Sequence, residues 1–190
     1  MTTYMVTQTK EQDETDLAQR AVRDVDAFAE LYRRHMIRVY RYHIAHVGNV
    51  KDAEDLTSQT FMAALEGIRS FRGSGTFAAW ILGIASRKKL MFFRGRKPAI
   101  PLDAVHHYPS PARPTDEAAS YRLQLESVSR ALRQISEDRA EALILTYFSG
   151  LSHAEASRVL NKTEAAVKML VSRGLQDLRE RTSLVLEVEL

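Results

Sequence analysis

The distribution of proline is the feature that most constrains the fold of this 190-residue chain. All five prolines lie in one stretch, residues 97–116, which reads KPAIPLDAVHHYPSPARPTD and has no apolar periodicity. Proline interrupts helices and keeps the residue before it extended, so this stretch predicts a semi-extended linker. The proline-free sequence on either side predicts two small domains, residues 16–96 and 117–182, with a disordered tail at 1–15 and a C-terminal tail at 183–190.

The N-terminal half has helical periodicity and no strand pattern. Asp24 is suited to cap a long helix that ends near Gly48. Its apolar residues recur at helical spacing: Phe28, Leu31, Tyr32, Met36, Val39, Tyr40 and Ile44. Asn49 and Asp52 resemble the capping box of a second helix. The apolar stripe of that helix is Ala53, Leu56, Phe61, Ala64, Leu65 and Ile68.

A third helix carries a concentration of positive charge. It follows the loop at residues 70–76 and begins at Ser74 or Thr76. Net charge over the whole chain is only +3, but the segment between Glu66 and Asp103 has no acid. Its cations are Arg69, Arg72, Arg87, Lys88, Lys89, Arg94, Arg96 and Lys97. Such a local positive field either solvates a helix end or holds an anionic partner, and its length beside Phe92 and Phe93 favours the partner.

The C-terminal half predicts four helices, at about residues 117–134, 136–149, 152–160 and 163–181. Gly150 is expected to end the second helix, and Ser152 with Glu155 forms a capping box for the third. Asn161 suits a left-handed turn, and Thr163 can cap the last helix. Two helices joined by so short a turn form a helix-turn-helix, so the whole chain is predicted to be all-α.

The second helix of a helix-turn-helix fits the major groove of DNA and presents its first turns to base edges. The residues that these turns expose here are Lys162, Thr163, Glu164, Lys168, Met169, Ser172 and Arg173. An ordinary helical hairpin would have the same spacing, so the pattern alone leaves both interpretations open.

Composition excludes several other classes. The chain has no cysteine, which removes disulfides, thiolate metal sites and a cysteine nucleophile. No leader peptide or membrane span is evident, so we expect a cytoplasmic protein. His43 and His46 have the spacing of two metal ligands on a helix, but no third ligand is evident and we expect no metal or cofactor.

Catalysis by the chain itself is not expected. Ser152, His153 and Glu155 are neighbours in one helical turn, which cannot give the geometry of nucleophile, base and orienting group. No phosphate-binding loop of the Walker type is present either.

Taken together, three segments resemble bacterial RNA polymerase sigma factors of the sigma-70 family, extracytoplasmic-function (ECF) type. They are DAEDLTSQTF at 52–61, FAAWILGIASRKKL at 77–90, and the run from Ile135 through GLSHAEASRVLNKTEAAVK to Arg181. Their order and spacing cover about residues 16–181.

The resemblance implies a role for each surface. Contacts with the clamp helices of the polymerase beta-prime subunit would come from Asp52, Asp55, Leu56, Gln59 and Met62. Contacts with the minus-ten element would come from Phe71, Arg72, Arg87, Lys88, Lys89 and Arg94, the first two by stacking on unstacked bases and the cations by phosphate contact. The last helix would read the minus-thirty-five element.

The expected partners are therefore core RNA polymerase, through its beta-prime clamp helices and beta flap, promoter DNA, and an anti-sigma factor. A second hypothesis is a free-standing helix-turn-helix regulator with N-terminal helices for dimerisation or ligand sensing. The acidic 52–61 segment discriminates between them, because a repressor has no use for a polymerase-docking face.

Overall fold

The computed structural model describes residues 13–73, 75–95 and 127–188, with side chains as far as residue 180. Within these ranges the chain consists of helices and turns without a strand, which confirms the predicted all-α class. The predicted linker and the start of the helix expected at 117–134 lie outside the described residues. No helix in the described part of the chain is both long and apolar enough to span a bilayer.

Helix α2 (Val25–Val47) begins and ends where its capping residues predict. The Asp24 carboxylate accepts hydrogen bonds from the backbone N–H groups of Asp26 and Ala27 at 3.0 and 3.3 Å. Gly48 ends the helix in the left-handed conformation at φ +74°, which glycine adopts without strain. Tyr32 was expected on the buried face but is 41% exposed, because it lies at the rim and packs edge-on against Phe61.

Helix α3 (Val50–Gly67) is capped by Asn49, whose side-chain oxygen accepts from the Asp52 N–H at 2.8 Å. The Asp52 carboxylate accepts a hydrogen bond from the Asn49 side-chain amide, so the capping box is only partly formed. The predicted stripe is buried except for Leu65, which is 47% exposed. Leu65 follows the fully buried Ala64, and one residue along a helix turns the side chain about 100° away from the core.

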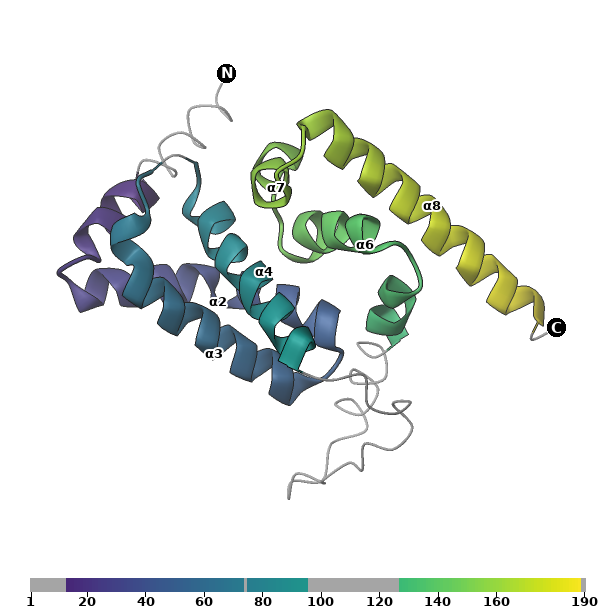
Figure 1. Cartoon of the computed structure of the whole chain (residues 1–190), viewed down its shortest axis with the longest axis horizontal. Helices are drawn as coiled ribbons and strands as arrows, with labels where there is room; N and C mark the ends of the chain where they lie inside the picture. The colour runs from purple at the N-terminus through teal and green to yellow at the C-terminus, as the bar shows by residue number, and fades with distance from the viewer. Residues whose placement is uncertain (1–12, 74, 96–126, 189–190) are drawn as a thin grey trace.

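The 3-10 turn η1 (Ile68–Ser70) and a glycine-containing loop lead into α4 (Phe77–Gly95). Thr76 caps α4, since its hydroxyl accepts from the Ala79 N–H at 3.2 Å. Helix α4 buries Ile81, Leu82 and Ala85 against its neighbours. Together α2, α3 and α4 form the N-terminal domain (Figure 1).

The C-terminal domain starts with a helical segment at 127–133, followed by α6 (Glu137–Leu143). The chain continues as a π-helix, η3 (Ile144–Phe148), whose wider turn closes with a bond from the Ser149 N–H to the Ile144 carbonyl at 2.9 Å. Helices α7 (His153–Leu160) and α8 (Glu164–Val188) complete it. Helix α8 extends past the predicted end at Arg181 and includes residues 182–188.

The two domains pack against each other (Figure 1). η3 contacts α2, α7 contacts α4, and α8 runs along the outside beyond α6. Buried residues of both halves form one hydrophobic cluster, which extends from Leu31 and Ile81 to Leu145 and Val167. In this conformation the chain is therefore closed, with a shared core between domains that the sequence predicts as separate.

Candidate nucleic-acid interface

The predicted helix-turn-helix has the capping geometry that its sequence indicates. The Ser152 hydroxyl accepts from the Glu155 N–H at 3.2 Å, and the Glu155 carboxylate accepts from the Ser152 N–H at 2.8 Å. Asn161 makes the turn in the left-handed conformation, with φ 52° and ψ 46°. Thr163 caps α8 by accepting from the Ala166 N–H at 3.2 Å. These local bonds set the direction of α8 relative to α7.

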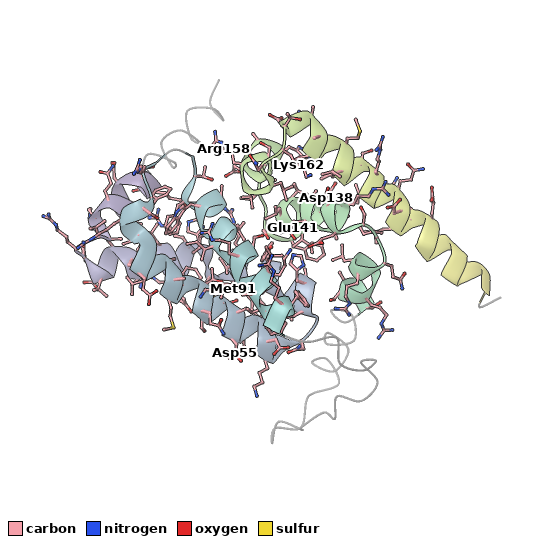
Figure 2. The ribbon with its side chains drawn as sticks, viewed as in Figure 1. Asp55, Met91, Asp138, Glu141, Arg158 and Lys162 are labelled. Atoms are coloured by element: carbon pink, nitrogen blue, oxygen red, sulfur yellow. The ribbon has the colours of Figure 1, made fainter. Side chains whose placement is uncertain are left out.

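All seven residues predicted on the recognition face are exposed: Lys162, Thr163, Glu164, Lys168, Met169, Ser172 and Arg173. The opposite face of α8 buries Val167 and Val171, which fixes the orientation of the helix against α6 and α7. Lys168 pairs with Glu164 at 2.7 Å, and Lys162 pairs with Asp138 of α6 at 3.1 Å (Figure 2). Both ion pairs are largely exposed, so the lysines can exchange them for phosphates at little cost.

The face of α3 that was predicted to bind polymerase is mostly exposed. Asp55 (Figure 2), Gln59 and Met62 face solvent, the last with 64% of its surface accessible, and Asp52 is half-buried beside Asn49. Leu56 is the exception, because it is only 2% exposed and belongs to the buried stripe of the helix. A direct contact through Leu56 is therefore ruled out in this conformation, since its side chain packs inward.

The predicted minus-ten residues are divided between surface and core. Arg72, Arg87 and Arg94 are exposed, and Lys88 is half-buried. Arg87 and Lys88 line a cleft between α3 and α4, together with Trp80 and Met91. The lining of the cleft includes one aromatic ring and two cations, which suits a base with its phosphate. Arg96 and Lys97 lie outside the described residues.

Phe71 lies in an aromatic cluster rather than projecting from its loop. Its ring centre is 5.5 Å from those of Phe77 and Trp80, and its side chain is half-buried. Base stacking is predicted for Phe71, whereas the structure packs its ring, like that of Trp80, against the core. The exposed aromatic surface of this cluster is at the edge of the cleft, through Trp80.

Lys89 is buried, with an exposed fraction of 5%, and its ammonium donates to Glu141 of α6 at 2.6 Å. Glu141 also accepts from the Tyr42 hydroxyl at 2.5 Å and lies 3.2 Å from His46 Nε2. Although burial alone would raise it, His46 and Lys89 lower the pKa of Glu141 to about 2, so the carboxylate is ionised. Burial lowers the pKa of His46, which is therefore neutral. Lys89 is not available to phosphates here.

His43 is a core residue. Its Nε2 lies 2.9 Å from the Thr60 hydroxyl, which already donates its hydrogen to the Leu56 carbonyl. Nε2 must therefore carry the proton, and Nδ1 has no partner among the described residues. Burial and the neighbouring His46 lower the pKa of His43 to about 3. The described part of the chain contains no cluster of ligands that could hold a metal.

Two family models match the chain in the order of its domains. Residues 31–98 match sigma-70 region 2, and residues 125–178 match sigma-70 region 4. The chain belongs to the sigma-70 family.

The chain is also similar to named ECF sigma factors. BldN of Streptomyces coelicolor is 34% identical over 171 residues, which cover 86% of this chain and 63% of BldN. SigW of Bacillus subtilis is 26% identical over 169 residues, which cover 83% of this chain and 90% of SigW.

Solved structures of sigma factors share the fold. The structure of CnrH in complex with the cytosolic domain of CnrY matches 90% of this chain and 97% of CnrH, with a TM-score of 0.69 and 23% identity. RpoE of Bartonella quintana, solved with the anti-sigma factor NepR, matches 80% of this chain and 94% of RpoE, with a TM-score of 0.61 and 23% identity.

Sequence analysis missed the residues that join region 2 to region 4. Besides Glu141, these include Glu155, whose carboxylate accepts from the Thr76 hydroxyl at 2.7 Å. Arg158 lies so close to Gly75 that a Cβ there would be 2.7 Å from the guanidinium. The one available signal was Glu141 itself, an acid within the apolar run of residues 140–145, where an unpaired charge would be costly.

Proposed function

We propose that this chain is a promoter-specificity subunit, which binds core RNA polymerase, recognises promoter DNA with its two domains and helps to open the duplex. The observation that carries the proposal is the joint exposure of the seven recognition residues at the start of α8 and in the turn before it, next to a buried stripe that orients the helix. A helix presented in this way fits the major groove. Region 2, residues 16–96, and region 4, residues 117–182, act as separate domains on either side of the linker.

Core polymerase binds region 2 through α3. Asp55, Gln59 and Met62 give a face with an acid, an amide and an exposed thioether, and the beta-prime clamp helices dock on it. Region 4 contacts the beta flap. A free-standing regulator would have no use for this acidic face, so polymerase binding separates the two hypotheses.

DNA opening uses the cleft between α3 and α4. Arg87 and Lys88 hold phosphates at its rim, and Trp80 provides a ring face for an unstacked base. Each flipped base costs a few kcal/mol of stacking, which these contacts offset. The chain performs no chemistry of its own, and it acts with polymerase in the cytoplasm. An anti-sigma protein is a further partner, as NepR is of RpoE.

The test is binding of the purified chain to core RNA polymerase, followed by transcription from a promoter library. Tight binding with selective initiation supports the proposal and yields the promoter sequence. Specific duplex binding by the chain alone, without polymerase binding, would instead favour the free-standing regulator.

The α3 face is tested by Asp55→Ala. We expect affinity for core polymerase to fall about tenfold, the loss of one charged contact, while the fold is unchanged because the side chain is exposed. Glu54→Ala is the matched control, since it removes an exposed acid from the same helix on the side away from the predicted face. Equal affinity of the two variants would remove Asp55 from the interface.

A further inference from the structure

One cluster of buried polar side chains connects the two domains. It joins Tyr42 and His46 of α2 and Lys89 of α4 to Glu141 of α6. Glu141 lies where the two domains meet (Figure 2). Glu141 and Lys89 are 6% and 5% exposed, and Tyr42 is fully buried. Because the carboxylate comes from region 4 and its three partners from region 2, the cluster exists only while the domains are in contact.

Closure covers part of the surface that is proposed to hold the minus-ten strand. Lys89 is paired with Glu141, and α7 packs against α4 near its start. There the Thr76 hydroxyl donates to Glu155 at 2.7 Å, and Arg158 lies against Gly75. The base-capturing loop is thus in contact with the first helix of the helix-turn-helix.

This contact is incompatible with simultaneous binding of both promoter elements. Elements named for positions minus ten and minus thirty-five are about 25 base pairs apart, or roughly 85 Å at 3.4 Å per base pair. Glu155 and Thr76 are within hydrogen-bond distance, so the domains must separate before each can reach its element.

The buried charges of the cluster make the equilibrium between closed and open forms sensitive to the loss of either charge. A buried ion pair contributes little net stability, because desolvation cancels much of the attraction, but removal of one partner leaves an uncompensated charge. When the domains part, water can solvate both Lys89 and Glu141. Loss of either charge should therefore shift the balance toward the open form rather than unfold a domain.

We infer that Tyr42, His46, Lys89 and Glu141 form a latch that holds the two domains closed and keeps part of the minus-ten surface, Lys89 and the start of α4, covered, an inference that rests on the proposed function for its biological meaning. The latch is an intramolecular, autoinhibitory contact. Its release exposes Lys89 and the loop at residues 70–76 to single-stranded DNA.

The latch is tested by distance measurement on the full chain. The sequence has no cysteine, so Gln19→Cys and Gln176→Cys introduce two unique dye positions that are exposed and are not among the predicted binding residues. We expect a single distance population in the parent, a large second population in Glu141→Gln and a smaller one in Tyr42→Phe. Tyr42→Phe keeps the buried ring and removes only the hydroxyl donor. It therefore still tests the latch if Glu141→Gln unfolds the chain.

Glu137→Gln is the matched control, because it makes the same charge change on the same helix at an exposed carboxylate 4.0 Å from Lys89. In the same samples, a short labelled single strand of random sequence should bind Glu141→Gln about tenfold more tightly than Glu137→Gln, since the binding-competent fraction rises. The Lys89→Met, Glu141→Gln double variant should close again, because no buried charge is left unpaired.

Each outcome is decisive. If Glu141→Gln keeps the distance of Glu137→Gln, the latch is overturned. If it opens but binds the single strand no better, the covering of the minus-ten surface is overturned. Opening and tighter binding in a chain that fails to bind core polymerase would leave the latch in place and remove the proposed promoter function instead.

Discussion

The two predicted DNA-contacting surfaces differ in how fully the structure presents them. The seven residues on the recognition face of region 4 all face solvent together, whereas the region 2 set is split. Arg72, Arg87 and Arg94 are exposed, but Phe71 packs in an aromatic cluster and Lys89 is buried against Glu141. The difference follows from position, because α8 lies on the outside of the molecule while α4 lies between the domains (Figure 1).

Helix geometry explains why α4 could not present its three consecutive cations together. Successive residues in an α-helix are rotated by about 100°, so residues 87 to 89 cover more than half of the circumference. Arg87 faces solvent, and Lys89 faces α6, where it meets an acid from the other domain. A run of like charges therefore identifies a charged segment but not a charged face.

The largest expected effect on region 2 comes from low pH, which acts on the buried histidines of that domain. The pKa of His43 is lowered to about 3 and that of His46 is also lowered, in each case chiefly by burial. As pH falls, the unfolded chain therefore binds protons at these histidines before the folded chain does. The contribution of the neutral histidines to the free energy of unfolding is complete above pH 6.5 and is lost as pH falls below it. Each proton adds a slope of about 1.4 kcal/mol per pH unit.

His43→Gln should reduce that slope by about 1.4 kcal/mol per pH unit between pH 6 and 5, as measured by urea unfolding at each pH. The window lies above the range in which Glu141, with its pKa of about 2, would contribute. An unchanged slope would show that His43 is not a buried neutral group.

The next effect separates local capping from contact between the domains. Ser152→Ala removes only the cap of α7, which should cost about 1 kcal/mol. Glu155→Ala also removes the acceptor of the Thr76 hydroxyl, and it should cost about 2 kcal/mol. The measurement is the free energy of unfolding of both variants, and equal losses would mean that the contact between domains adds no stability.

The smallest effect on stability concerns the exposed recognition face. Lys168→Gln breaks an exposed pair with Glu164 and should change stability by less than about 0.5 kcal/mol. It should nevertheless lower the slope of log affinity against log salt concentration for promoter-duplex binding by the amount expected for about one phosphate contact. Arg20→Gln, which breaks an exposed pair with Asp24 outside both DNA sets, is the control and should leave the salt dependence unchanged.

The sequence by itself determined the helices and the helix-turn-helix, because the signals are local. Asp24, Asn161 and Thr163 cap or turn the chain through bonds to residues within a few positions, and the apolar period then orients each helix. The recognition face of α8 could be predicted for the same reason, since the buried Val167 and Val171 define its opposite side.

Only the tertiary structure decided what the junction does. Lys89 and Glu141 are 52 residues apart in the chain, Thr76 and Glu155 are 79 apart, and Tyr42 and Glu141 are 99 apart. No local period or cap encodes such pairs, because they depend on how two separately formed domains pack across an interface. The same packing places Lys89 inside the molecule, where the sequence suggests a surface cation.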